Sequence, residues 1–163
     1  MFRRAIKRVA AGVVLASFAA GAALAACAPD RVDIRGAFGT ATFTVELADE
    51  PAERAQGLMF REKMSTSAGM LFIYDRPQRA TFWMRNTLIG LDMIFVDPQG
   101  VVTNIHENAI PLDETTIDGG DGVLAVLEIN AGLVARFGIQ VGDELRHPAF
   151  DQAQAIWPCD EKP

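Results

Sequence analysis

The chain has few of the side chains that most often carry enzyme chemistry, with 2 histidines, 2 cysteines and 1 tyrosine among 163 residues. The histidines, His106 and His147, lie far apart and no HExxH pattern is present, so we expect no metal site. The serines lie near the start of the chain or in a polar segment, and no Gly-x-Ser-x-Gly occurs, which excludes the usual serine hydrolases. No glycine-rich phosphate loop opens a long helix, and we expect no cofactor.

The first 26 residues have the pattern of an export signal. Basic residues within positions 3–8 precede an uncharged run over 9–26 that is rich in Ala, Val and Leu and ends in small residues. A retained membrane helix is the alternative, but the Ala and Gly content makes this run only weakly apolar. We predict a cleaved signal peptide over 1–26 and a single mature domain over 27–163 that is exported to the periplasm.

The mature chain is strongly acidic. Removal of residues 1–26 leaves 11 Lys and Arg against 21 Asp and Glu, a formal charge of −10. An acidic surface cannot neutralise phosphates, so we expect no nucleic-acid partner. Ordinary solubility is a sufficient explanation for the charge itself.

The two cysteines, Cys27 and Cys159, lie on either side of the folded region. In an oxidising compartment they are expected to pair as a disulfide. The alternative is lipid attachment at Cys27, because Leu24-Ala25-Ala26-Cys27 fits the pattern of a lipidated N-terminus, and only then would the protein be tethered to a membrane. No Cys-x-x-Cys is present, so a redox-active role is not expected.

Short strands alternate with turn signals along the mature chain. Pro51 predicts the first turn of a short helix that Gly57 ends, and a second helix is expected over 131–137 before Gly138. The 76–78 segment is expected to break a strand, and 111–122 to form a loop. We predict strands over 42–47, 69–74, 80–87, 91–96, 101–107 and 123–129, with a closing strand within 141–146 and an irregular tail over 148–163.

The connections between these strands are mostly too short for crossover helices, which excludes a doubly wound parallel sheet. We therefore predict a mainly β (α+β) fold. It is expected to be a compact, mostly antiparallel barrel-like or folded sheet of six or seven short strands with two short helices.

Several motifs in one order resemble the domain-of-unknown-function 192 family of bacteria and archaea, over about residues 32–147. They are the segments 53–61, 69–72 and 80–97, then Val126-Leu127-Glu128 and Ala131-Gly132. Gly90 stands where the family pattern has proline. The resemblance implies a compact, largely β domain that often follows a signal sequence, and it implies no agreed catalytic residues.

Asp92 is an acid within an apolar strand, and an unpaired buried carboxylate costs several kcal/mol. As a functional group it would have a raised pKa and act as a general acid or base. As a structural group it would accept hydrogen bonds from Asn86 or the turn over 87–90, or pair with Arg61 or Arg85.

An aromatic side chain next to a cation lies close by in the sequence. Trp83 and Arg85 share one face of the predicted strand, which suits sugars, peptides or carboxylate ligands. Arg61 would add a bidentate contact to an anion. We predict a ligand-binding cleft formed by Arg61, Trp83, Arg85, Asn86 and Asp92.

Glu128 points away from its apolar neighbours if its strand alternates, and we expect it to be solvent-facing or paired. A carboxylate couple with Asp92 is the alternative. The sequence favours an exported, non-catalytic binding or accessory domain of the cell envelope that holds a small polar or anionic ligand. The alternatives are a hydrolase or lyase acting on an envelope polymer through Asp92, and a scaffold whose Trp83 face contacts an envelope protein.

Overall fold

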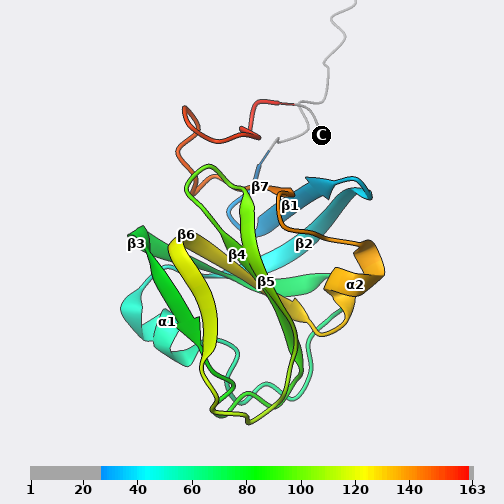
Figure 1. The fold of residues 1–163 in the computed structure, drawn as a ribbon, viewed down its shortest axis with the longest axis vertical. Helices are drawn as coiled ribbons and strands as arrows, with labels where there is room; N and C mark the ends of the chain where they lie inside the picture. The colour runs from blue at the N-terminus through cyan, green and yellow to red at the C-terminus, as the bar shows by residue number, and fades with distance from the viewer. Residues whose placement is uncertain (1–26, 162–163) are drawn as a thin grey trace, which may run out of the picture.

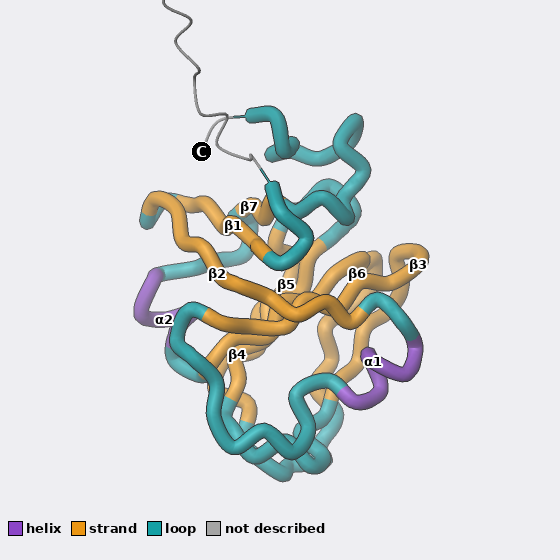
Figure 2. The backbone as a smooth tube through the Cα atoms, turned by 180° about the vertical axis from the view of Figure 1, so that it is seen from behind, coloured by secondary structure: helices purple, strands orange, loops and turns teal. Residues whose placement is uncertain are grey.

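The computed structural model describes residues 27–161, which form one curled sheet and two short helices (Figures 1 and 2). The strands lie in the order β5-β4-β6-β3-β2-β1-β7, and all neighbours are antiparallel except β2 and β3. This half-barrel confirms the predicted mainly β, mostly antiparallel fold. The elements are β1 (Arg31–Gly36), β2 (Gly39–Ala48), α1 (Pro51–Gln56), β3 (Ala68–Phe82), β4 (Leu91–Val96), β5 (Val102–Ala109), β6 (Ile117–Asn130), α2 (Leu133–Phe137) and β7 (Glu144–Arg146).

The two edge strands of the sheet, β5 and β7, meet at their N-terminal ends. The Val102 amide donates to the Asp143 carbonyl at 2.8 Å, and the Leu145 amide donates to the Gly100 carbonyl at 2.7 Å. These bonds curl the sheet, because they hold together strands that lie at opposite ends of its order.

The sheet buries apolar side chains on both faces, since successive residues of a strand point to opposite sides. All six residues of β4 are buried. The inner cluster lies on the face that α2 covers and includes Ile34, Phe43, Leu71, Ile94, Leu127, Ile129, Val134 and Leu145. The outer cluster lies on the other face and includes Leu58, Met70, Phe72, Met84, Met93, Phe95 and Val126.

Turn and cap residues place three predicted elements correctly. Pro51 opens α1, whose first turn is closed by a bond from the Glu50 amide to the Glu53 carboxylate at 3.2 Å. The Asp97 carboxylate accepts the amides of Gln99 and Val101, both at 2.9 Å, and fixes the β4–β5 hairpin. The second predicted helix also forms, as α2.

The predicted break at 76–78 is wrong, and the predicted loop over 111–122 is confirmed only up to residue 116, because β3 and β6 form one long ribbon. β3 runs through Pro77, and β6 begins at Ile117. The register shifts between Ile73 and Gln78, where β3 pairs with β6 alone, so the missing proline amide is tolerated at a bulged edge. The predicted strand over 80–87 ends at Phe82, and β1 was not predicted.

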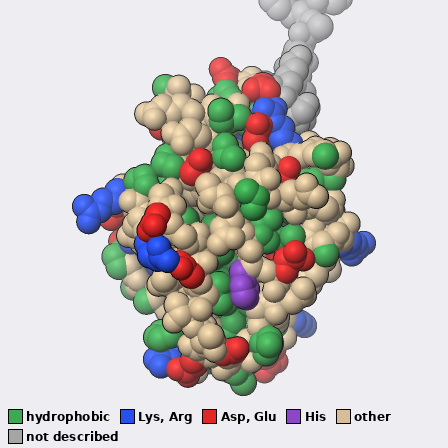
Figure 3. Space-filling model, in the orientation of Figure 1, with side chains coloured by type: hydrophobic (Ala, Val, Ile, Leu, Met, Phe, Trp, Pro, Cys, Tyr) green, Lys and Arg blue, Asp and Glu red, His purple; other side chains and the backbone are tan. Residues whose placement is uncertain are grey.

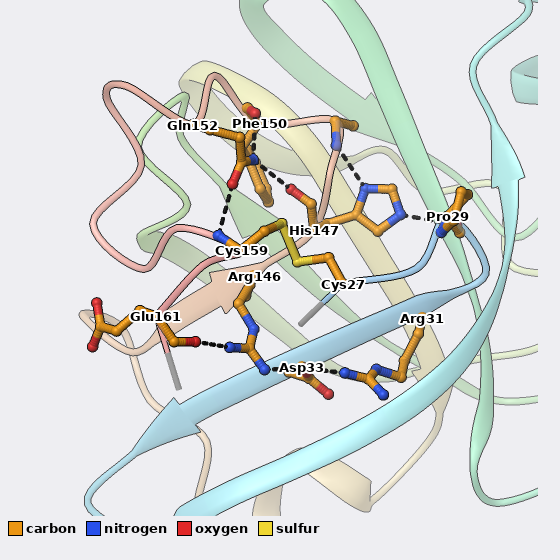
Figure 4. The surroundings of a disulfide bond; sticks show 11 residues. Cys27, Pro29, Arg31, Asp33, Arg146, His147, Phe150, Gln152, Cys159 and Glu161 are labelled. Atoms are coloured by element: carbon orange, nitrogen blue, oxygen red, sulfur yellow. Dashed lines mark hydrogen bonds and ion pairs between the residues drawn. A yellow bond between two sulfur atoms is a disulfide. The ribbon is translucent and has the colours of Figure 1, made fainter. Parts of the chain in front are cut away.

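The tail after β7 is tied to the start of the described chain (Figure 4). Cys27 and Cys159 form a disulfide that spans 132 positions, with their Cα atoms 5.3 Å apart. Trp157 is buried between two guanidinium groups, with the Cζ atoms of Arg35 and Arg146 at 4.5 Å and 4.3 Å from its ring. The disulfide is the predicted pairing, and a sulfur in this bond is not available for lipid attachment.

The predicted signal peptide, residues 1–26, lies outside the described residues. Within 27–161, no helix has the length and apolar character needed to span a bilayer.

Candidate functional site

A pocket of about 440 Å³ lies on the outer face of the sheet, between α1, β3 and β6. Its volume falls within the range of small-molecule sites, about 300–1,000 Å³. The residues that follow α1 and the loops carrying Thr87 and Thr116 complete the rim. The side chains that decide its chemistry are Arg54, Phe72, Tyr74, Phe82, Trp83 and Glu128.

Gly57 brings the end of α1 against the sheet. Its φ of +49° lies in the left-handed region, and a Cβ at this position would lie 3.1 Å from the Cζ atom of Phe72. A glycine therefore allows the backbone to pack directly on the Phe72 ring. This contact forms one wall of the pocket.

Glu128 forms part of the pocket surface and is only 4% exposed. Its neighbours across the ladder are Met70 on β3 and Met93 on β4, so the acid lies between two apolar side chains. It has no hydrogen bond or ion pair with any other residue in 27–161. Burial raises the pKa of Glu128 to about 8. The expectation that this side chain is solvent-facing or paired is wrong.

Arg54 and Tyr74 line the pocket beside this acid. The Arg54 guanidinium donates to the carbonyls of Asp49 and Ile73, the latter at 2.8 Å, and its Cζ lies 5.7 Å from the Tyr74 ring centre. Burial raises the pKa of Tyr74, and the charge of Glu128 adds to this rise while Arg54 opposes it. Arg54 is held by backbone carbonyls rather than by Glu128.

Trp83 is the only one of the five predicted site residues that lines this pocket. It is 46% exposed, and the Arg85 guanidinium covers its ring at 4.2 Å. Arg85 is paired with Glu114 at 2.7 Å. The indole is therefore held in place by a cation whose charge is already neutralised.

Arg61 and Asn86 lie outside the pocket. Both terminal nitrogens of Arg61 bond to the Glu46 carboxylate at 2.5 Å, and the Asn86 amide donates to the Met59 sulfur at 3.9 Å. The Arg61 fork is thus occupied by an acid of the same chain. The predicted set does not converge on one cleft.

Asp92 lies on the inner face and is fully buried. One carboxylate oxygen accepts the Asn108 amide and the other accepts the Val134 amide, both at 2.8 Å. The acid thus joins the end of β5 to the start of α2, and its partners are not those expected from the sequence. Glu128 pairs across the ladder with Met93, so Asp92 and Glu128 point to opposite faces and form no carboxylate couple.

Replacing Asp92 by asparagine is expected to lower the free energy of unfolding by about 2–3 kcal/mol, because an amide NH₂ replaces one of two oxygens that accept buried backbone amides. Urea denaturation measures the change. Asp75→Asn is the matched control, since Asp75 is exposed, and it is expected to stay within about 0.5 kcal/mol. Unchanged stability of Asp92→Asn would show that these bonds are not what retains the acid.

The motif order and the curled sheet agree with one family. The model of the DUF192 family, described as "Uncharacterized ACR", matches residues 32–147. This chain belongs to the DUF192 family. The match includes α1, β3 and β6, which carry the pocket, and Glu128 lies within it.

Two solved structures share this fold. A protein of unknown function from Novosphingobium aromaticivorans DSM 12444 is 50% identical, with a TM-score of 0.69 over 71% of this chain and 82% of that one. A protein from Sinorhizobium meliloti 1021, described as a candidate transcription regulator, is 46% identical, with a TM-score of 0.69 over 71% of this chain and 90% of that one. A search of the curated proteins gives no match.

Within residues 27–161, no three His, Cys, Asp or Glu side chains lie close enough together to hold a metal ion. The lining of the pocket offers one buried acid, one engaged arginine and aromatic walls.

Proposed function

We propose that this DUF192 protein is an exported, non-catalytic binding domain of the cell envelope, and that the pocket between α1, β3 and β6 holds a small organic ligand. The observation that carries the proposal is Glu128, a buried acid without a protein partner on the surface of a pocket of about 440 Å³. Buried polar groups in proteins are nearly always satisfied. The Glu128 oxygens are not among the fully enclosed unsatisfied atoms of residues 27–161, so they reach the pocket surface, where a ligand could pair with them.

The pocket is better suited to binding than to hydrolysis. Glycoside hydrolysis by paired carboxylates needs a second acid within about 5–9.5 Å of the first on the same side of the substrate. Among the described residues that line the pocket, Glu128 is the only acid, and Asp92 faces the other side of the sheet. We therefore favour the binding role over the hydrolase or lyase.

Export is supported by the predicted signal peptide and by the Cys27–Cys159 disulfide, because disulfides persist in oxidising compartments. One relative is described as a candidate transcription regulator. The formal charge of −10 for residues 27–163 argues against DNA as a partner of this chain. On the face shown in Figure 3, acidic and basic side chains are interspersed rather than gathered into a basic patch.

The proposal predicts that fragment-sized aromatic compounds raise the unfolding temperature of the purified protein. Trp83→Ala is expected to weaken binding about tenfold or more, because the indole provides a stacking surface at the rim. Thermal shift and tryptophan emission measure this effect, and Trp157 is buried elsewhere. The screen uses aromatic amines, alcohols and carboxylates.

Phe60→Ala is the control, since Phe60 is 66% exposed and does not line the pocket. Binding by this variant should equal that of the wild type. If no compound stabilises the wild type more than Trp83→Ala, the pocket does not serve as a ligand site.

A further inference from the structure

We propose that the ligand is an organic ammonium ion carrying an aromatic or apolar group, and that Glu128 is its counter-ion. This inference rests on the proposed function and names the ligand class that the pocket would accept. It reverses the expectation of an anionic ligand, which depended on Arg61 and Arg85. Both arginines are engaged by acids of the same chain, Glu46 and Glu114.

The other buried acids show what Glu128 lacks. Three acids of residues 27–161 are buried, namely Asp33, Asp92 and Glu128. Asp33 pairs with Arg146 at 2.6 Å, and Asp92 accepts two backbone amides. Only Glu128 is without a donor or a cation within the described chain. Since the fold satisfies the first two internally, the third is the group left for an external partner.

Arg54 is the basic side chain that shares the pocket, and it does not neutralise the acid. Its guanidinium donates to two backbone carbonyls and lies against Tyr74. Burial is the cause of the raised pKa of Glu128, with no opposing contribution from Arg54. A cation that enters the pocket would therefore meet an acid that is still unpaired.

The walls suit a cation as well. Phe72, Tyr74, Phe82 and Trp83 line the pocket, and the faces of aromatic rings carry negative potential that attracts ammonium groups. The Tyr74 and Trp83 rings already contact the guanidinium groups of Arg54 and Arg85, so Phe72 and Phe82 are the two rings of this lining with no such contact within residues 27–161. An anion would face this potential and, at a pH where Glu128 is ionised, the carboxylate as well. A neutral aromatic molecule would pack on the walls but leave the acid without a charged partner.

Cation binding must displace a proton from Glu128. The titratable or charged groups that share its pocket are Tyr74 and Arg54, while its ladder neighbours Met70 and Met93 carry no charge. With a pKa of about 8, Glu128 is mostly protonated at pH 7. On binding, that proton passes to solvent and the carboxylate pairs with the ammonium group. Affinity should rise about tenfold from pH 6 to 7 and about fivefold from pH 7 to 8.

Three probes with the same ring and different charge test the ligand class. They are 2-phenylethylamine, 2-phenylethanol and phenylacetate, titrated calorimetrically into the wild type at pH 6, 7 and 8. The amine is expected to bind tightest and to release about 0.9 proton per molecule at pH 7, measured in buffers of different ionisation enthalpy. Glu128→Gln is expected to weaken amine binding at pH 8 by about tenfold or more and to abolish its pH dependence.

Glu107→Gln is the matched control, because Glu107 is exposed on β5 and does not line the pocket. Its amine affinity should equal that of the wild type. Tighter or equal binding of phenylethanol or phenylacetate by the wild type at pH 8, where about half of Glu128 is ionised, would overturn the ammonium assignment, and so would amine affinity that does not change with pH.

The two proposals fail differently. If the neutral or anionic probe binds in a Trp83-dependent manner without any advantage for the amine, the pocket is still a ligand site and only the ammonium assignment is lost. If none of the three probes binds and the wider screen also shows no Trp83-dependent ligand, both are overturned. The comparison of probes uses the wild type, so it does not depend on the folding of Glu128→Gln.

Discussion

The double substitution Cys27→Ser and Cys159→Ser is expected to lower the free energy of unfolding by about 5 kcal/mol. The disulfide closes a loop of 132 positions, and in the chain-entropy model the stabilisation by a cross-link grows with the length of the loop it closes. This effect acts mainly on the unfolded chain, whose ends become free to separate. A loss of this size is comparable to the whole stability of many small domains.

Urea denaturation of the two forms measures the loss, and replacing both cysteines leaves no unpaired thiol. Trp157 gives a local signal, because its ring is buried against the guanidinium groups of Arg35 and Arg146 and lies two positions before Cys159 in the chain. If the tail detaches before global unfolding, emission from Trp157 should shift to the red while Trp83 is unaffected. A change in stability below about 1 kcal/mol would show that the tail contacts alone hold the ends together.

The second large effect is a dependence of stability on pH that comes from Glu128. The folded pKa is about 8, whereas the ordinary value is 4.5, so the folded state binds the proton more tightly than the unfolded state. The stability that this proton contributes is complete below pH 4.5 and is lost as the pH rises to 8. The expected loss is on the order of 4 kcal/mol.

Glu128→Gln should remove this loss, because glutamine fills the same volume and stays neutral. The two proteins should therefore be similar near pH 5, and the variant should be the more stable near pH 8.5. The difference between the two profiles isolates Glu128 from His147, whose pKa is lowered by burial and which therefore makes stability rise with pH in both proteins. Parallel profiles over this range would show that the acid is already ionised and solvated in the folded protein.

The sequence predicts the elements whose signals are local. Pro51 and Gly57 delimit α1, and the Asp97 turn joins β4 to β5, because each depends on backbone conformations that single residues favour. The long β3–β6 ribbon was missed since Pro77 and the glycines after Asp118 resemble breaks in isolation. They are accommodated only because the facing strand shifts its register at these positions.

The site was harder to predict for a different reason. Asp92 and Glu128 are both single acids in apolar strands, and the sequence favoured the first. Alternation of polar and apolar residues shows which face of a strand is exposed only when one face of the sheet contacts solvent. Both faces of β4 are buried, so its sequence does not show which way Asp92 points. Whether an acid lines a pocket depends on which part of the outer face α1 and the loops leave uncovered. This arrangement is a property of the tertiary structure and cannot be read from local sequence. The position of Glu128 in the Val126-Leu127-Glu128 motif was the one signal in the sequence that pointed to this acid.

The two neighbours of Glu128 in β6 limit how far the acid can move when a ligand binds. Leu127 and Ile129 are fully buried on the opposite face of the sheet, so the strand cannot rotate to rehydrate the acid without exposing both. The base of the pocket is therefore rigid, and the desolvated acid is preorganised before any guest arrives. Changes in selectivity would be achieved at lowest energetic cost at Ala55 and Gln56, which line the pocket from the exposed side of α1 and can vary without disturbing the strand that carries the acid.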